Sequence, residues 1–290
     1  MKPAPFIHLA PTSIKDALAL LNEHAPDARV LAGGQSLVPL MNFRLSRPSH
    51  LIDLNRIPDL SYIRQNSDHL SIGAMTRERT IENSELVRTH VPLLHEATSY
   101  IGHLPIRSRG TIGGSIVNAD PAAEYPAALL ALDGEMVLHS TRGKRHVPAA
   151  SFFEGVLSTV LEPDELLAEL IVPKTVPGTG SAFLEISRRH GDFALVGIAA
   201  QVTMSGETIT KVQLAACGVG DGPVRLSNAE HIVLEAGLTE LSVKLAARTA
   251  ADEVNPVNDL HASADYRRRL TAVLTQRALM KAHGRLQSNS

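Results

Sequence analysis

The sequence is poor in the residues that carry several common chemistries. Its only cysteine is Cys217, which excludes a disulfide framework, a zinc knuckle and a set of thiolate ligands for an iron–sulfur cluster on this chain. It has no tryptophan, and aromatic residues make up 3% of the total, which argues against a base-stacking surface for nucleic acid. We expect Cys217, between an alanine and a glycine, to be a buried small residue.

Charge of one sign and long apolar runs are also missing. Lys and Arg number 28 against 30 Asp and Glu, so no excess charge points to nucleic acid or an anionic membrane. No apolar run approaches the roughly 20 residues that cross a bilayer, and the start lacks the apolar core of a signal peptide. None of the 13 histidines has a metal-ligand spacing such as H-E-x-x-H. We therefore expect no nucleic-acid partner, no membrane insertion, no metal site and a cytoplasmic location.

The residues that are present have the composition of an ordinary globular protein and the patterns of helices and strands. The 290 residues, 44% of them hydrophobic, are enough for two or three domains. Ser13 and Asp16 have the spacing of a capping box, and apolar residues follow at i, i+3, i+4 and i+7 from Ile14, which predicts a helix to His24. A strand at 28–32, a short helix with Ser36 as its candidate N-cap and a strand at 50–54 then predict a β-α-β-like unit.

The rest of the chain reads as two further groups of elements. Hairpins are predicted around 66–68 and over 135–149, helices within 81–102 and 121–132, and a strand over 165–173. The Pro- and Gly-rich segment 174–181 is the best linker. Three strand-like runs after it predict an antiparallel meander, and two amphipathic helices follow. The last helix is predicted to stop at Gly284, with residues 286–290 frayed.

Two glycine pairs stand out, one in "VLAGGQSLVPLM" and one in "RGTIGGSI". A glycine pair at a strand end allows φ > 0 and lets a ligand touch the backbone, whose successive amides suit an anion. Ser36 follows the first pair, and Thr111 and Ser115 flank the second. Neither pair has the spacing of G-x-G-x-x-G or of a P-loop. The residues alone thus leave two readings open, plain tight turns or a cradle for a diphosphate ligand.

Longer segments around these pairs resemble a known family. "LAGGQSLVPLMNFRLSRPSHLIDL" and "IRSRGTIGGSIVNADPAAEYPAALLALDGE" are similar to the two flavin-binding segments of the FAD-binding medium subunit of molybdenum hydroxylases, the carbon monoxide dehydrogenase and xanthine dehydrogenase family. "AFLEISRRHGDFALVGIAA" and "DYRRRLTAVLTQRAL" resemble the start of that subunit's C-terminal domain and its last helix. Four ordered motifs make the resemblance run nearly end to end.

The resemblance implies an α+β fold: two FAD-binding subdomains of the vanillyl-alcohol-oxidase type, followed by an α/β domain with a three-stranded antiparallel sheet and helices. The corresponding boundaries here are 1–55, 56–176 and 177–290. The implied function is an FAD-carrying electron-transfer subunit. Its implied partners are a small subunit with two [2Fe-2S] clusters and a large molybdopterin subunit, in a dimer of three-chain units, a heterohexamer.

The family's cofactor residues carry over onto both glycine segments. By this resemblance, residues 32–37 and the second glycine segment contact the diphosphate of FAD, and Glu124 contacts the ribose. Leu167 lies beside the adenine half, and Phe193 lies against the isoalloxazine ring. Glu124 stands where relatives often have Asp. The full implied set is Leu31, Ala32, Gly33, Gly34, Gln35, Ser36, Leu37, Thr111, Gly113, Gly114, Ser115, Asn118, Asp120, Glu124, Leu167, Asp192 and Phe193. No residue is expected to act as acid, base or nucleophile.

Two other functions remain open from the sequence. One is a self-sufficient FAD-dependent oxidoreductase with substrate over its own flavin, which needs an acid/base group that the sequence does not identify. The other is a non-catalytic binding module whose glycine turns are structural.

Several basic residues are also interpreted from the sequence. Arg107 and Arg109 are predicted to be phosphate partners or solvated side chains, His103 a loop histidine, and 267–269 the solvent-exposed face of a helix. The substrate of the complex and the electron acceptor are not determined by this chain.

Overall fold

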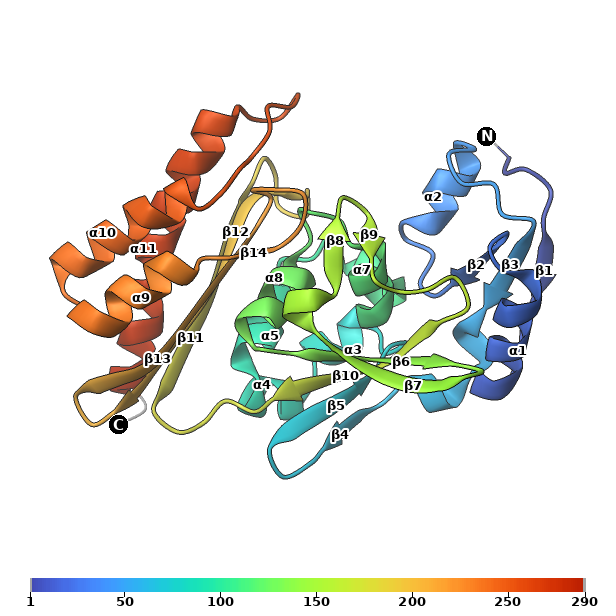
Figure 1. The fold of residues 1–290 in the computed structure, drawn as a ribbon, viewed down its shortest axis with the longest axis horizontal. Helices are drawn as coiled ribbons and strands as arrows, with labels where there is room; N and C mark the ends of the chain where they lie inside the picture. The colour runs from blue at the N-terminus through green and yellow to red at the C-terminus, as the bar shows by residue number, and fades with distance from the viewer. Residues whose placement is uncertain (1, 289–290) are drawn as a thin grey trace.

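The computed structural model describes residues 2–288 and has three parts in chain order (Figure 1). We call them the N-terminal region (2–55), the middle region (56–176) and the C-terminal region (177–288). Each has its own main sheet, and the middle region lies between the other two (Figure 1). This is the mixed α+β architecture expected from the sequence. The boundaries themselves remain predictions.

The N-terminal region is a small parallel sheet with two helices. Its strands lie in the order β1-β3-β2, and both pairs are parallel. They are β1 (Ile7–Leu9), β2 (Ala28–Leu31) and β3 (His50–Asp53), with α1 (Ile14–His24) and α2 (Leu37–Asn42). Ser13 caps α1 as predicted, because its Oγ accepts the Asp16 N–H at 3.1 Å. The predicted β-α-β unit is present, and the sequence reading missed only β1, whose residues are mostly exposed.

The middle region is built on a five-stranded antiparallel sheet in the order β4-β5-β10-β6-β7. The strands are β4 (Ile63–Gln65), β5 (His69–Gly73), β6 (Glu135–Ser140), β7 (Gly143–Pro148) and β10 (Leu166–Pro173), with a small hairpin β8 (Phe153–Gly155) and β9 (Ser158–Thr159). The helices are α3 (Glu78–Glu82), α4 (Glu85–His90), α5 (Pro92–Thr98), α6 (Leu104–Arg109), α7 (Ile112–Asn118) and α8 (Glu124–Ala131). Short 3₁₀ turns lie at η1 (Leu54–Arg56), η2 (Pro58–Leu60) and η3 (Ala149–Ser151). Both predicted hairpins and the strand ending at Pro173 are confirmed.

The second glycine pair corrects the sequence reading. Gly113 and Gly114 lie in the first turn of helix α7 and not in a left-handed turn at a strand end. Thr111 begins this helix, and its Oγ1 accepts the Gly114 N–H at 3.1 Å. A glycine pair is a poor local predictor of helix. Here close packing, described below, requires the missing side chain at Gly113.

The C-terminal region is an antiparallel meander covered by three helices. The three predicted strands are β11 (Thr179–Ser187), β12 (Ala194–Ser205) and β13 (Thr208–Cys217), and a two-residue strand β14 (Val224–Arg225) extends the sheet to four. Helices α9 (Ser227–Ala236), α10 (Glu240–Asp252) and α11 (Ala264–Ser288) cover one face. The other face, including Phe183, Ala199 and Cys217, packs into the core of the middle region. Alternate residues of one sheet therefore serve two cores.

Helix α11 continues past Gly284 to Ser288, so the predicted stop is wrong. A glycine costs a helix only about 1 kcal/mol, and Arg285 and Leu286 make tertiary contacts beyond it. Residues 289–290, which the predicted fraying also covers, lie outside the described residues. The predicted linker is shorter than 174–181, because β11 begins at Thr179, and the Lys174 N–H donates to Asp68 O at 2.9 Å.

Within residues 2–288, no helix combines the length and the apolar character that crossing a membrane requires. The cytoplasmic location stays a prediction.

Candidate functional site

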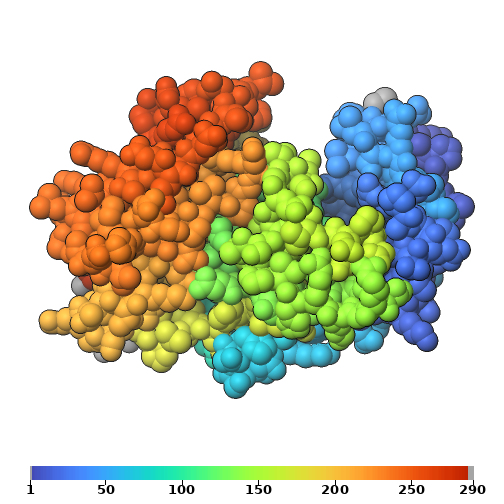
Figure 2. All heavy atoms as spheres, viewed as in Figure 1, coloured from blue at the N-terminus to red at the C-terminus, as the bar shows by residue number. Residues whose placement is uncertain are grey.

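A cavity of about 840 Å³ lies where the three regions meet. This is within the range of cofactor and small-molecule sites. The hollow is visible in Figure 2 between the blue N-terminal region and the green middle region. Of the 17 residues predicted to bind the cofactor, 16 line it; the exception is Leu31. The Leu31 side chain lies instead next to Gly34, where a Cβ would be 3.3 Å from its Cδ1.

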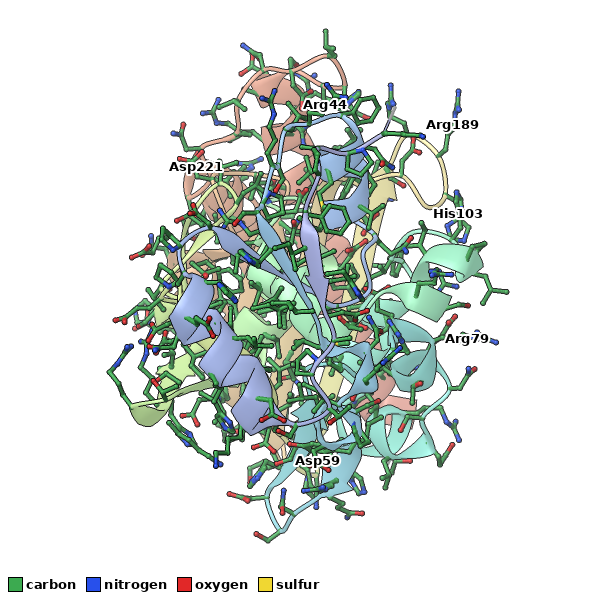
Figure 3. The ribbon with its side chains drawn as sticks, turned by 90° about the vertical axis from the view of Figure 1, so that its right-hand side faces the viewer. Arg44, Asp59, Arg79, His103, Arg189 and Asp221 are labelled. Carbon is green, nitrogen blue, oxygen red and sulfur yellow. The ribbon has the colours of Figure 1, made fainter. Side chains whose placement is uncertain are left out.

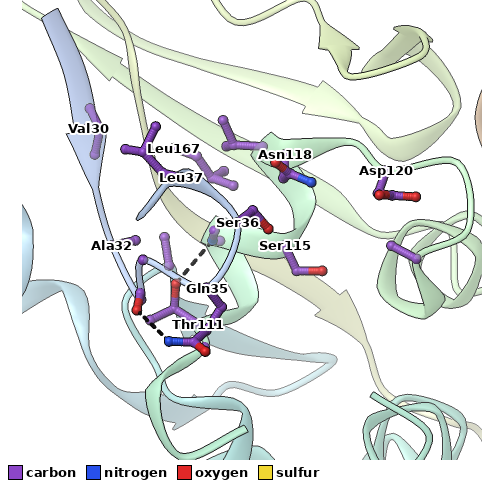
Figure 4. A pocket seen from close by; sticks show the side chains of 18 of the residues that line it. Val30, Ala32, Gln35, Ser36, Leu37, Thr111, Ser115, Asn118, Asp120 and Leu167 are labelled. Carbon is purple, nitrogen blue, oxygen red and sulfur yellow. Dashed lines mark hydrogen bonds between the residues drawn. The ribbon is translucent and has the colours of Figure 1, made fainter. Parts of the chain in front are cut away.

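The loop between β2 and α2 offers free backbone amides to this cavity. Gly34 has φ +74°, the left-handed conformation predicted for the first pair. The amides of residues 34–37 have no hydrogen-bond partner within residues 2–288, and these residues line the cavity. The Gln35 amide nitrogen donates to Gly33 O at 3.2 Å and folds the loop (Figure 4). Ser36 stands at the N-cap position, but its side chain does not cap α2, which leaves its hydroxyl for a ligand.

Gly33 lacks a side chain because another backbone occupies the space. A Cβ there would collide with Arg109 O and lie 2.8 Å from the Gly110 Cα. Real Cβ atoms do not approach backbone this closely, so the β2–α2 loop and the segment 109–110 can meet only through glycine. The first pair thus has two functions. Gly34 turns the chain, and Gly33 brings the N-terminal and middle regions together beside the cavity.

Helix α7 forms another part of the wall. Its first amides are already used, because Gly113 N–H donates to Ala74 O at 2.9 Å and Gly114 N–H to Thr111 Oγ1. A Cβ on Gly113 would lie 2.5 Å from Ala74 Cβ. Gly113 therefore lets α7 approach the end of β5. The hydroxyl group of Ser115 and the side-chain amide of Asn118 line the cavity (Figure 4). The backbone cradle belongs to the first glycine loop alone.

Two buried carboxyl groups line the cavity and form no salt bridge with any residue in 2–288. Glu124 begins α8 with 6% of its surface exposed, and Glu78 begins α3 with 4% exposed. Burial raises the pKa of Glu124 to about 7, and the backbone amide of Glu124 itself opposes this. Burial and the charge of Glu124 raise the pKa of Glu78 to about 8 against the effect of Arg107 and Arg77. Asp120, by contrast, accepts the Ala122 N–H at 2.9 Å. Glu78 and Glu124 therefore add less negative charge to the cavity wall at neutral pH than two ordinary carboxylates would.

The mouth of the cavity is formed by the loop between β11 and β12. Gly191, Asp192 and Phe193 line it, and Phe193 is 69% exposed. His103, which stands at the N-cap of α6, and Arg189 project at the same edge of the molecule (Figure 3). The ring of His103 lies 6.3 Å from that of His190. Part of a bound ligand would remain accessible at this edge.

Two arginines have structural functions that the sequence reading missed. Arg107 is buried; it pairs with Glu82 at 2.9 Å and donates to Ile101 O at 2.8 Å. It is neither a solvated side chain nor a cavity residue, whereas Arg109 is exposed. Arg267 is also buried and pairs with Asp259 at 2.6 Å, so the predicted wet face of 267–269 does not include it. Cys217 is buried as expected, and burial raises the pKa of its thiol.

Other cavity residues gave no signal in the sequence. Residues 157–159 and 161–163 of the loop and hairpin form part of the wall, as do Ile101 and Glu78. They come from separate elements and match no motif, so only the packing brings them together. Among residues 2–288, no group of three or more His, Cys, Asp and Glu side chains is arranged to hold a metal ion.

Comparison with known proteins identifies the family to which this chain belongs. The model of the FAD-binding domain in molybdopterin dehydrogenases matches residues 4–175, and that of the carbon monoxide dehydrogenase flavoprotein C-terminal domain matches residues 181–282. The chain belongs to the FAD-binding medium subunits of the molybdenum hydroxylases. It is therefore a subunit of the oxidoreductase class, and the domain that builds its cavity is an FAD-binding domain.

Relatives match this medium subunit over nearly its whole length. It is 40% identical to the alpha subunit of the 6-hydroxypseudooxynicotine dehydrogenase complex of Paenarthrobacter nicotinovorans, covering 97% of this chain and 96% of that one. It is 38% identical to the carbon monoxide dehydrogenase medium chain of Hydrogenophaga pseudoflava, covering 98% and 99%. A solved structure of carbon monoxide dehydrogenase from the same organism, lacking the Mo-pyranopterin moiety, contains a chain with a TM-score of 0.96 at 39% identity, covering 98% of this chain and 99% of that chain.

Proposed function

We propose that this chain is the electron-transfer flavoprotein of a three-component molybdenum hydroxylase. It receives electrons from a subunit with two [2Fe-2S] clusters, which takes them from a molybdopterin subunit, and passes them to an external acceptor. The observation that carries the proposal is the cavity at the junction of the three regions, lined by 16 of the 17 residues expected to bind FAD. Relatives described as medium chains or complex subunits support the assembly with partners.

The residues of the cavity fit an FAD molecule. The unpartnered amides of 34–37 suit the diphosphate, and Ser36, Ser115 and Asn118 add polar groups beside it. Glu124 is buried in the wall, and a hydrogen bond to a ribose hydroxyl is its expected contact; Leu167 offers an apolar surface. Phe193 covers the edge of the mouth. We assign the 17 predicted positions except Leu31 to cofactor binding, and 1–55, 56–176 and 177–290 as the three domains.

Bound flavin would supply the redox chemistry, because flavin accepts electrons singly and releases them as a pair. This chain's own residues bind and orient the cofactor, keep water from its buried part, and leave one edge accessible at 191–193. No described cavity residue needs to act as an acid or base toward an organic substrate. The oxidation of substrate is therefore assigned to the molybdenum subunit.

Purification from the native host tests the assembly. We expect the chain to copurify with two further polypeptides, together with iron, sulfide and molybdenum, and the preparation to be yellow. The isolated chain, reconstituted with FAD, should be yellow and inactive toward organic substrates in the presence of an artificial acceptor. Turnover by the isolated chain would instead support the self-sufficient oxidoreductase. Protein that stays colourless after reconstitution would support the binding module and overturn the proposal.

A further inference from the structure

Glu78 is a buried, charged-type cavity residue to which none of the preceding assignments gives a function. It begins α3, and its backbone N–H donates to Gly110 O at 3.1 Å. Its side chain lies directly under Gly110, where a Cβ would be 2.5 Å from Oε2. Only 4% of the residue is exposed, yet it lines the cavity. Its carboxyl group is thus held at the junction of the N-terminal and middle regions.

The Oε2 atom of Glu78 is buried and has no hydrogen-bond partner within the described residues. Leaving a buried polar group unpaired costs about 1–3 kcal/mol. The neighbouring arginines do not satisfy it, because Arg107 pairs with Glu82 at 2.9 Å and Arg77 donates to Asn55 Oδ1 at 2.6 Å. An unpartnered polar atom at a cofactor cavity indicates a contact that the ligand supplies.

Burial and the charge of Glu124 favour the neutral form of Glu78, and two nearby arginines oppose them. Glu124 faces it from α8, Arg107 from α6 and Arg77 from its own N-terminal side, and Tyr125 lies near enough for their charges to interact. Burial and the Glu124 charge raise the pKa of Glu78 to about 8, while the two arginines lower it. At neutral pH, the carboxyl group is therefore a hydrogen-bond donor as well as an acceptor.

We propose that Glu78 is a cofactor-binding residue that contacts the bound dinucleotide as a neutral acid and donates a hydrogen bond to one of its acceptor atoms. The inference rests on the proposed function, since it needs a flavin dinucleotide in the cavity. FAD carries a diphosphate, so an ionised carboxylate in the same cavity would repel it, whereas the neutral acid does not. Binding of FAD then holds the proton on Glu78 and becomes coupled to protonation.

The test measures FAD affinity of the cofactor-free chain against pH. Above the pKa of Glu78 in the cofactor-free chain, its carboxyl group is ionised, and FAD binding must restore the proton. The FAD affinity of the wild type should therefore fall about tenfold between pH 7 and pH 9 through this group alone. Glu78→Gln keeps a neutral donor of the same shape. Its FAD affinity at pH 7 should lie within about threefold of that of the wild type. Between pH 7 and pH 9, its affinity should fall by a factor that is about tenfold smaller than the factor for the wild type.

Calorimetry in two buffers of different ionisation enthalpy measures the proton directly. At pH 8, the wild type should take up about half a proton more on FAD binding than Glu78→Gln does. Glu85→Gln, an exposed carboxyl partner of Arg88 on α4, is the matched control and should behave as the wild type. Glu78→Ala, which removes the donor, should bind FAD about tenfold more weakly at pH 7.

Three results would overturn the inference. One is an unchanged pH profile in Glu78→Gln, and another is a loss of affinity above tenfold in that variant at pH 7, which would mean that the ionised form is the one required. The third is the absence of proton uptake by the wild type at pH 8, a measurement that needs no variant to fold. A wild-type chain that binds no FAD at any pH would instead overturn the proposed function.

Discussion

At the scale of single residues, the glycines of this chain are required by contacts from distant segments as much as by turns. Gly33 is packed against the backbone of residues 109–110 and Gly113 against Ala74, and neither has a positive φ. Only Gly34 of the first pair has the left-handed conformation. A glycine pair in a sequence therefore does not distinguish a turn from a close approach of two backbones.

Gly113→Ala should lower the free energy of unfolding by about 1–3 kcal/mol, because the new Cβ would lie 2.5 Å from Ala74 Cβ and 2.7 Å from Ala74 O. Gly284→Ala is the matched control, since Gly284 is also helical and a Cβ there meets nothing within 4 Å. The control should be neutral or gain about 0.5–1 kcal/mol. Urea unfolding of both variants measures the difference. Equal effects would contradict the packing argument.

At the scale of elements, the β2–α2 loop, which we call the cofactor loop after its proposed function, is held by hydrogen bonds from outside it. Asn55, in η1, donates to Ala32 O at 2.9 Å and accepts from Arg77 at 2.6 Å, and Arg77 also donates to Arg109 O. The β2–α2 loop is thus connected to the start of α3 and to the end of α6. Its free amides owe their position to this connection between the N-terminal and middle regions.

Asn55→Ala should weaken FAD binding by about tenfold, because it removes two hydrogen bonds that position the loop, each worth about 1 kcal/mol. Since Asn55 is exposed, the melting temperature should change little. Asn66→Ala is the control; Asn66 also bonds through its side chain, to His69 at 2.9 Å, but in the β4–β5 turn and outside the cavity. Fluorescence titration with FAD gives the affinities. If the two variants bind FAD equally well, the loop does not depend on Asn55.

At the scale of the whole molecule, the C-terminal region is joined to the middle region through Glu96 on α5. Its carboxylate accepts from Lys281 and Arg285 of α11 at 2.7 Å each and from the Phe183 N–H of β11 at 3.0 Å. Together with the β12 and β13 residues that enter the middle core, this network fixes the position of the loop 191–193. The mouth of the cavity therefore depends on how two regions dock.

Glu96→Gln should lower the free energy of unfolding at pH 7 by about 1–2 kcal/mol, because it removes the charge that two partly exposed cations share. Burial raises the pKa of Glu96, but its bonds to Arg285, Lys281 and Phe183 outweigh burial and lower it overall. A lowered pKa gives stability that is present above the carboxyl's ordinary value and is lost as the pH falls. The difference between wild type and variant should therefore shrink below about pH 4.

Chemical unfolding at pH 7 and pH 3 measures that trend. Glu85→Gln, which breaks only the exposed pair with Arg88, should cost no more than about 0.5 kcal/mol at either pH. A loss in Glu96→Gln as small as in this control would show that the two regions dock without the ion pairs.

The sequence by itself determined the local elements and the cofactor loop. Apolar periodicity predicted α1 and the meander of β11 to β13, and the family-like segments located 16 of the 17 expected residues at one cavity. These signals are readable because helix and strand periods and turn conformations depend on residues close in the chain. Motifs in order also carry the family's cofactor positions with them.

Only the tertiary structure decided what each side chain meets. It placed Gly113 in a helix and buried Arg107 and Arg267 in ion pairs. Leu31 lies outside the cavity wall, and Oε2 of Glu78 lies at the cavity with no hydrogen-bond partner among the described residues. Each of these outcomes depends on segments that are far apart in the sequence and meet only after packing. Spacing patterns do not encode such contacts, because burial and partner choice are properties of the assembled core.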